Sequence, residues 1–311
     1  MTRLFEIFPI LEVWVRIIYK FVLSKGIIKN RIVPNEKAQD AIKVPKAKLD
    51  RYLDSVGIQT GDVLIVHSSM KGIKGFGLSA DELIDILLKR VGKSGMLFMP
   101  AYPEYPSAAQ SLSYNEMYNN IDTYDVSNTK GWTGYITEVF RCRKDVVRSC
   151  FPNNTLAGAG NDIEKIFESE LESDLAFGKH SAWNYCLERH AKVLFLGIHA
   201  HHSISEIHIA EDQMDSKWPI RGWYAVKHYR IICGDKEIKK DCRVRKTFWN
   251  RYMTEYNGCY RLRKEGLLME NMIDNICVSF IPDVKKLTDY VTQRAVKGDL
   301  VYFKIPKKYR R

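Results

Sequence analysis

The chain has 311 residues, of which 45% are hydrophobic and 12% aromatic, enough to bury a large core. Its 48 Lys and Arg residues against 37 Asp and Glu residues give a net charge of +11, which favours anionic partners. Seven cysteines without paired spacing argue against a disulfide framework, and neither an export signal nor a nucleic-acid-binding signature is present. We therefore expect a cytoplasmic protein that binds small phosphorylated molecules and no nucleic acid.

Residues 1–45 differ from the rest of the chain and predict an N-terminal amphipathic helical extension. Within residues 4–23, apolar side chains recur at helical spacing, and Glu12, Arg16 and Lys20 form a single polar stripe. Charges inside this run argue against a membrane-spanning helix. Two alternatives stay open: peripheral contact with an anionic membrane surface or, as the favoured alternative, packing on the body of the protein or on a second subunit of a homo-oligomer.

Residues 46–311 are expected to form one large domain, because short apolar runs alternate there with helical patterns. Three apolar runs predict buried strands, at 61–69, 95–102 and 191–198. A helix is predicted after Ser79, since Ser79 and Glu82 have the spacing of a capping box. The alternation indicates an α/β fold, a layered sheet with helices on both faces.

Three stretches follow predicted strands, where sheet enzymes usually assemble their sites. The first, "VHSSMKGIKGFG" at 66–77, combines hydroxyls, a lysine and three glycines, which can present N–H groups and a positive charge to a phosphate. It lacks the order of a Walker motif, and an ordinary loop is the simpler explanation. The second, "RSCFPNNTLAGAG" at 148–160, is rich in turn residues and indicates nothing further by itself.

The third stretch, at 199–211, holds four of the chain's eight histidines. His199, His201 and His202, in "HAHH", resemble part of an HxHxDH metal signature. The aspartate of that signature is missing, so no metal is expected. His208 and Glu211 are three residues apart in a predicted helix, which lets a carboxylate orient an imidazole. On these residues alone, a structural pair and a catalytic base with its partner both stay open.

In their order along the chain, these motifs resemble the aminoglycoside 3-N-acetyltransferase family, from about residue 46 to about residue 295. The stretches that carry the resemblance are "VHSSMKGI", "GMLFMPAY", "DVSNTKGWTGYITEVFR", "RSCFPNNTLAGAG", "DLAFGKHS", "KVLFLGI" and "SEIHIAE". The resemblance implies a three-layer α/β/α fold with a central mixed sheet. It also implies transfer of acetyl from acetyl-CoA to the amine of a small-molecule acceptor, with no metal.

The resemblance further implies roles for individual residues. His208 matches the family's active-site histidine, Glu211 its partner carboxylate, and Asp174 an acidic residue before "FG". The stretch that helps to bind CoA in the family supplies the expected co-substrate contacts, which are His67, Ser68, Ser69, Lys71 and Phe76. Segments beside the acceptor in the family supply the expected acceptor contacts, which are Asp125, Thr129, Phe151, Asn154 and Thr155.

The chemistry of acetyl transfer explains these residue types. A sugar amine is mostly protonated at neutral pH, and His208 can remove a proton as the nitrogen attacks the thioester. Glu211 or Asp174 would fix the tautomer of the imidazole. Backbone N–H groups of the Ser68–Ser69 turn are expected to meet the oxygen of the thioester as it becomes an oxyanion.

One stretch departs from the family pattern. Phe151 and Thr155 stand where many members have histidine and serine, which predicts a flat apolar face and neutral hydrogen bonds beside the acceptor. A net charge of +11 would repel polycations, so the sequence favours an amino sugar linked to a nucleotide, of the kind used in surface polysaccharide biosynthesis. The alternative is an aminoglycoside, which would make the protein an antibiotic-resistance enzyme.

Overall fold

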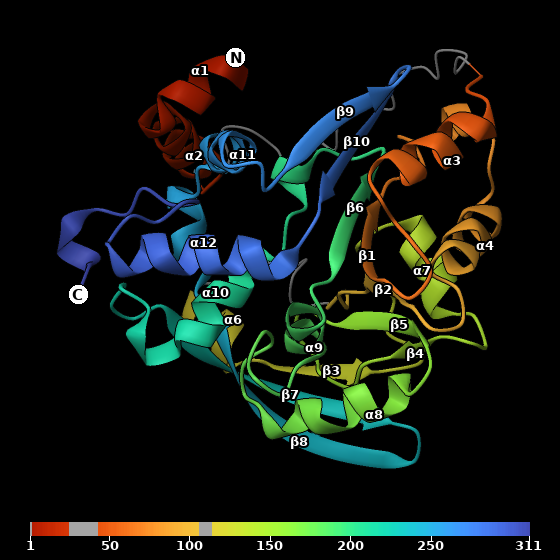
Figure 1. Ribbon diagram of the computed structural model, residues 1–311. Coiled ribbons are helices and arrows are strands. Elements are labelled where there is room, and N and C mark those ends of the chain that lie inside the picture. Colours follow the sequence, from red (N-terminus) through yellow and green to blue (C-terminus); the bar gives the residue numbers. More distant parts are fainter. Residues whose placement is uncertain (1, 25–42, 106–113) are drawn as a thin grey trace.

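The computed structural model of the chain describes residues 2–24, 43–105 and 114–311 (Figure 1). The helices are α1 (Thr2–Ile7), α2 (Pro9–Ser24), α3 (Lys46–Ser55), α4 (Ala80–Val91), α6 (Tyr114–Asn119), α7 (Tyr135–Arg141), α8 (Ile163–Glu168), α9 (Ala182–Glu188), α10 (Ile207–Met214), α11 (Glu255–Lys264) and α12 (Val284–Val296). The strands are β1 (Val63–Ser68), β2 (Met96–Pro100), β3 (Ile121–Asp125), β4 (Val147–Arg148), β5 (Leu156–Gly160), β6 (Lys192–Leu196), β7 (Tyr224–Cys233), β8 (Lys236–Arg245), β9 (Met269–Ile273) and β10 (Ile276–Ile281).

Within the described ranges, seven strands form the central sheet, in the order β4-β5-β2-β1-β6-β10-β9 (Figure 1). β1 lies parallel to β2 and to β6. The outer pairs, β6 with β10, β10 with β9, β2 with β5 and β5 with β4, are antiparallel. The sheet is therefore mixed, as expected. β1 is buried along its whole length, which explains why its sequence, VLIVHS, begins with four apolar residues in a row.

Side chains of the central strands alternate between two apolar clusters, one on each face of the sheet. Along β1, Val63 and Ile65 belong to the cluster that includes residues of α9, α10 and α12. Leu64 and Val66 belong to the other cluster, which includes residues of α3, α4 and α7. Helices thus cover both faces (Figure 1), and the predicted α/β/α layering is confirmed.

The three strands predicted from apolar runs are β1, β2 and β6, and the helix predicted after Ser79 is α4. The Ser79 hydroxyl accepts a hydrogen bond from the Glu82 backbone N–H, and the Glu82 carboxylate accepts one from the Ser79 backbone N–H. This capping box satisfies N–H groups of the first turn that have no partner within the helix.

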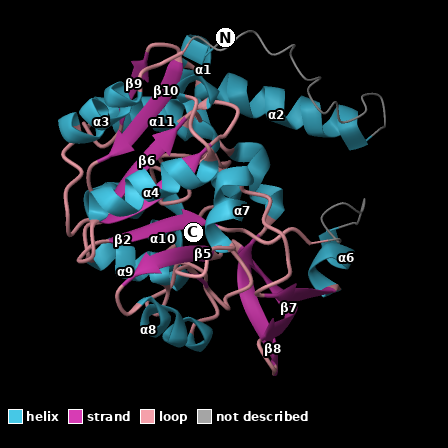
Figure 2. Ribbon diagram, turned by 90° about the vertical axis from the view of Figure 1, so that its right-hand side faces the viewer, coloured by secondary structure: helices cyan, strands magenta, loops and turns pink. Residues whose placement is uncertain are grey.

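A smaller sheet of β3, β7 and β8 was not predicted from the sequence. β3 lies parallel to β7, and β7 pairs with β8 in a long antiparallel hairpin, which projects from the body in Figure 2. Gly234, with φ of 59°, makes the tight turn between the two strands possible. β8 ends at Arg245 and so carries Arg243 and Arg245 toward the edge of the central sheet where β1 and β6 end.

The N-terminal extension consists of two helices, because Pro9 begins α2 and its ring cannot continue α1. α1 packs on α11, and Arg16 of α2 pairs with Glu255 at the start of α11. The helices therefore contact the body of the chain. Among the described residues, no helix has both the length and the apolar character that a membrane span requires. The part of the predicted extension at 25–42 lies outside the described residues.

Candidate active site

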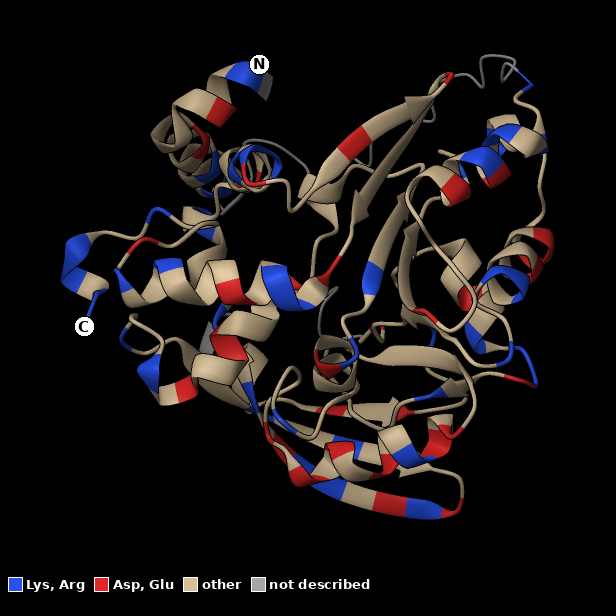
Figure 3. Ribbon diagram, in the orientation of Figure 1, with Lys and Arg blue, Asp and Glu red and all other residues tan. Residues whose placement is uncertain are grey.

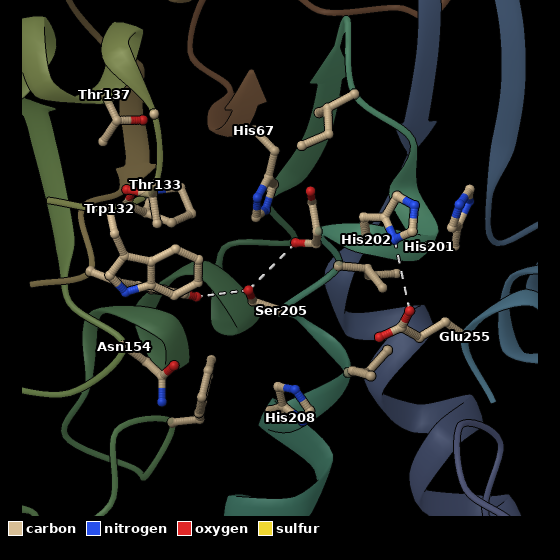
Figure 4. A pocket seen from close by; sticks show the side chains of 18 of the residues that line it. His67, Trp132, Thr133, Thr137, Asn154, His201, His202, Ser205, His208 and Glu255 are labelled. Carbon is tan, nitrogen blue, oxygen red and sulfur yellow. Dashed lines mark hydrogen bonds and ion pairs between the residues drawn. The ribbon is translucent and has the colours of Figure 1, made fainter. Parts of the chain in front are cut away.

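A cavity of about 830 Å³ lies at the carboxyl ends of β1 and β6 (Figure 4). Because these strands are parallel neighbours, the loops that follow them lie at the same edge of the sheet, and both line the cavity. Further walls come from the segments around Trp132, Asn154, Arg245 and Glu255.

Two glycines bring the loops after β1 and β6 into main-chain contact. A Cβ atom on Gly72 would lie 1.9 Å from the carbonyl oxygen of Gly197, and a Cβ atom on Gly197 would lie 2.6 Å from the carbonyl carbon of Gly72. Gly197 also has φ of 68°, in the left-handed region that favours glycine. A side chain at either position would push the loops apart, so these glycines set the spacing between two walls of the cavity.

His208, near the start of α10, lines the cavity (Figure 4). Its Nδ1 lies 2.7 Å from Oε1 of Glu211, one helical turn later. The other carboxylate oxygen of Glu211 accepts a hydrogen bond of 3.1 Å from the indole N–H of Trp223. Both oxygens are therefore held in place. Because a carboxylate can only accept, this arrangement assigns the imidazole proton to Nδ1 and leaves the lone pair on Nε2.

Burial and a neighbouring guanidinium group favour the neutral form of His208. Nη1 of Arg245 lies 3.1 Å from both ring nitrogens. Burial lowers the pKa of His208 below its ordinary value of 6.5, Arg245 lowers it further, and Glu211 acts in the opposite direction. An imidazole that is unprotonated at neutral pH is in the form that a general base requires.

Asp212 is a second carboxyl group of α10 that lines the cavity, and the sequence motifs did not single it out. Its Oδ2 accepts a hydrogen bond of 3.0 Å from the backbone N–H of Phe177, and its Oδ1 accepts one of 2.9 Å from the Tyr224 hydroxyl. Burial raises the pKa of Asp212 to about 7. This group therefore titrates near neutral pH and, when ionised, can receive a cation from the cavity.

A second imidazole–carboxylate pair lies at the same cavity. Nε2 of His67 is 2.9 Å from Oε1 of Glu206, and the His67 ring stacks on Phe195 with the ring centroids 4.8 Å apart. Glu206 is fully buried, and its Oε2 has no hydrogen-bond partner among the described residues. The hydrogen bond and the stacking together fix the orientation of His67 at the cavity wall.

Most of the residues expected to contact the co-substrate line the cavity, namely His67, Ser68, Ser69 and Lys71. Phe76 does not, because its side chain is buried in the apolar cluster beneath α3, α4 and α7. The backbone N–H of Ser69 donates to the carbonyl oxygen of Leu196 at 3.0 Å. That donor of the Ser68–Ser69 turn is therefore already engaged within the protein.

Of the residues expected beside the acceptor, Asn154 lines the cavity and the other four do not. Phe151 and Thr155 are buried, and the Thr155 hydroxyl donates to the Phe151 carbonyl oxygen at 2.7 Å. Phe151 packs in the core and offers no face to a ligand. Asp125 and Thr129 form a turn in which the Asp125 backbone N–H donates to the Thr129 hydroxyl at 2.9 Å.

Asp174 contacts Arg243 and not the imidazole of His208. Nε of Arg243 lies 2.5 Å from Oδ2 of Asp174, and its Nη2 lies 3.0 Å from Oδ1. Arg243 also pairs with Asp215 and holds the pKa of Asp174 below its ordinary value. Asp174 therefore orients a guanidinium group of the cavity wall, while the place beside Nδ1 of His208 is taken by Glu211.

Among the lining residues that the motifs did not assign are Tyr102, Trp132 and Arg245. Trp132 is 63% exposed, and its ring centroid lies 5.7 Å from that of Tyr102 (Figure 4). The Tyr102 hydroxyl donates to Ser205 at 2.7 Å, which joins the loop after β2 to the loop after β6. A tryptophan between two glycines, in "KGWTGY", was the available sequence signal for Trp132. Arg245 gave none, because it reaches the site only through the smaller sheet.

The remaining histidines do not assemble a metal centre. The rings of His199 and His201 stack with centroids 5.2 Å apart, and His201 lies against Tyr256 at 4.5 Å. Burial lowers the pKa of His201 to about 4. In the part of the chain that the structure describes, no group of three or more His, Cys, Asp or Glu side chains could hold a metal ion.

Comparison with known proteins identifies the family. The model of the family described as aminoglycoside 3-N-acetyltransferase matches residues 65–293, well over half of the chain. Aminoglycoside N(3)-acetyltransferase IV from Salmonella sp. is 27% identical over 231 residues, which cover 71% of this chain and 78% of that protein. The chain therefore belongs to the aminoglycoside 3-N-acetyltransferase family, and the resemblance read from the motifs is confirmed.

Solved structures share the fold. The apoenzyme of aminoglycoside acetyltransferase AAC(3)-IVa has a TM-score of 0.65 at 21% identity, covering 88% of this chain and 96% of that chain. AAC-IIIb in a binary complex with CoASH has a TM-score of 0.67 at 17% identity, covering 85% of this chain and 98% of that chain. These likenesses confirm the α/β fold.

Proposed function

We propose that the chain transfers the acetyl group of acetyl-CoA to an amine of an amino sugar, with His208 as the general base and Glu211 as its partner. The observation that carries the proposal is the partly buried His208–Glu211 pair in the wall of the cavity. Ser68, Ser69 and Lys71, from the stretch that the family resemblance assigns to CoA, line the same cavity. The related AAC-IIIb was solved with CoASH, which supports acetyl-CoA as the donor.

The proposed reaction uses the neutral form of the acceptor amine. Its nitrogen attacks the carbonyl carbon of the thioester, and Nε2 of His208 accepts a proton from that nitrogen. Glu211 stabilises the imidazolium that forms. The C–S bond then breaks, its electron pair stays on sulfur, and the thiolate takes the proton back from the imidazolium. The products are the N-acetylated amine and CoA, and the atoms balance without a further reactant.

An aminoglycoside is the acceptor that the relatives support. The Salmonella relative is named for this activity, and solved relatives hold a gentamicin and sisomicin. The charges of the cavity are compatible with a polycation, because Arg243 is already paired with Asp174 and Asp215. The two groups that donate hydrogen bonds to Asp212, a backbone N–H and a hydroxyl, are both neutral. When Asp212 is ionised, its negative charge can therefore attract an ammonium group of the acceptor.

A nucleotide-linked amino sugar is a second candidate, favoured by two cations of the cavity wall. Lys71 follows β1, and Arg245 lies beside His208. A pyrophosphate would be attracted to both. Trp132 offers a flat apolar face on which a nucleotide base could stack. The net charge of +11 adds less weight, because basic and acidic residues are interspersed along β8, α8 and α12 in the view of Figure 3.

Replacement of the base tests the proposed mechanism. We expect His208→Ala to lower kcat by about 100-fold or more, the usual scale for the loss of a general base, while CoA still binds in a calorimetric titration. His228→Ala is the matched control, since His228 lies on the smaller sheet and pairs with Asp241 outside the cavity. Turnover near the wild-type rate in His208→Ala would remove His208 from the mechanism.

The two acceptor classes are separated by kcat/KM at matched ionic strength. We expect gentamicin to exceed a uridine-diphosphate amino sugar by at least about tenfold, and Asp212→Asn to raise the KM for gentamicin. Arg245→Gln should not raise that KM, because it removes a cation from the cavity wall. The second candidate is right if the nucleotide-linked sugar is preferred, its KM increases with salt and Arg245→Gln raises it further.

A further inference from the structure

The helix pair of α1 and α2 turns Glu6, Glu12 and Arg16 toward the protein and most of its apolar side chains toward solvent. Glu12 is 2% exposed and accepts a hydrogen bond of 3.0 Å from the backbone N–H of Glu255. Arg16 lies 2.9 Å from the Glu12 carboxylate and 2.6 Å from that of Glu255. Glu6 pairs with Arg263 of α11. This is the reverse of an ordinary surface helix, whose apolar stripe faces the core.

The outward side of the helix pair is rich in large apolar side chains. Those more than half exposed are Ile7, Phe8, Ile10, Trp14, Val15, Ile18 and Phe21. We call this set the outer apolar face. Figure 2 shows α2 along the outer edge of the molecule. A large exposed apolar patch on a folded protein marks a surface that another body covers.

We propose that the outer apolar face binds the surface of an anionic lipid bilayer. Helices with one apolar side lie in the plane of a membrane and insert that side at the boundary between headgroups and acyl chains. Trp14, on α2, has the kind of side chain that is enriched at this boundary. Arg3 is exposed, whereas Glu6 and Glu12 are both paired with arginines. The described part of the helix pair thus presents a positive charge suited to anionic lipid.

A second copy of the chain fits the outer apolar face less well. Pairing two identical faces would bring the exposed Arg3 side chains of both copies to one interface. An anionic bilayer surface instead offers charges that attract Arg3.

Cosedimentation of the full chain with vesicles tests the proposal. The wild-type protein should bind vesicles of phosphatidylcholine mixed with phosphatidylglycerol, and bind vesicles of phosphatidylcholine alone much less. Combining Trp14→Glu with Ile18→Glu should lower the partition coefficient at least about tenfold, since both charges enter one side of α2. The matched control combines Met272→Glu with Val296→Glu, which adds the same charges at exposed apolar positions of β9 and α12 and should bind like the wild type.

Circular dichroism and acetyl transfer in solution, which the Trp14–Ile18 double variant should retain, check that each variant folds. Ile7→Glu is a second variant of the outer apolar face should the first fail to fold. The proposal is overturned if the wild type does not bind anionic vesicles, or if the variants of this face bind as well as the control. It is also overturned if light scattering detects a wild-type dimer that these variants split, because a second copy would then cover the face.

Discussion

At the scale of single residues, His208 lies between a carboxylate that would hold its proton and a guanidinium group that would drive the proton off. Oε1 of Glu211 is 2.7 Å from Nδ1, while Nη1 of Arg245 is 3.1 Å from each ring nitrogen. Burial acts in the same direction as Arg245, so the pKa of His208 lies below 6.5. The ring is therefore available as a base over a wider range of pH than a histidine in water.

This arrangement predicts how the pH dependence of the reaction responds to Arg245. Removing the cation makes the imidazolium easier to form, so Arg245→Gln should raise the pKa of His208 and move the acidic limb of the kcat/KM profile to higher pH. Arg245→Lys keeps the charge and should leave the limb near its wild-type position. Titration of the acceptor ammonium also affects the kcat/KM profile, but it does so equally in the wild type and in both variants. A limb that stays in place in Arg245→Gln contradicts the assignment of the base.

The contact between His208 and Glu211 could be predicted because both residues lie in one turn of one helix, where spacing alone determines proximity. Phe151 could not be placed in this way. A phenylalanine in a turn-rich stretch suits a binding surface and a core equally well, and only the packing of distant strands decided for the core. Arg245 lies far along the chain from His208 and became a neighbour only when β8 formed.

At the scale of elements, the cavity depends on the main-chain contact between the loops after β1 and β6. Gly197→Ala should lower the free energy of unfolding by about 1–3 kcal/mol more than Gly57→Ala does. Both glycines have a positive φ, 68° and 72°, but a Cβ on Gly57 meets nothing within 4 Å, whereas one on Gly197 meets Gly72 at 2.6 Å. Urea denaturation measures the difference. Equal losses in the two variants would mean that the loops can separate at no cost.

Three strands of the central sheet, β1, β2 and β6, were predictable because both of their faces are buried, which requires runs of apolar residues. β7 escaped prediction because Lys227 interrupts it with a charge that is nevertheless buried. Its ammonium group donates to the carbonyl oxygens of Met117 and Asn120, at 2.6 and 2.7 Å, and pairs with Asp122 at 3.0 Å. Those partners come from a separate segment, so no local pattern in β7 reveals that the lysine is satisfied.

At the scale of the whole molecule, the carboxyl groups of the buried Glu170 and the partly buried Asp212 link stability to pH. Burial raises the pKa of Glu170 from 4.5 to about 7 and that of Asp212 from 3.8 to about 7. Above pH 4.5 the unfolded chain releases protons that the folded protein keeps. The stability contributed by these groups is therefore full at low pH and is lost as the pH rises through about 7.

Replacing Glu170 tests this linkage without touching the cavity. Glu170 accepts hydrogen bonds from the Ser149 hydroxyl and from the Ala182 backbone N–H, and an amide oxygen can replace only one of these acceptors. We expect Glu170→Gln to have a lower free energy of unfolding than the wild type at pH about 5. This difference should decrease by on the order of 2 kcal/mol when the pH is raised to about 7.5. The exposed Glu168→Gln serves as the control. A difference that does not change with pH would contradict the raised pKa.

Glu255 belongs to two parts of the molecule at once. It lines the cavity, yet its carboxylate pairs with Arg16 and its backbone N–H is capped by Glu12. Removal of the first 45 residues would take away Arg16 and leave the Glu255 carboxylate in the cavity wall without its arginine partner. The trimmed enzyme would attract cationic acceptors more strongly than the intact one. Acceptor preferences measured on a fragment would then describe the truncation as much as the enzyme.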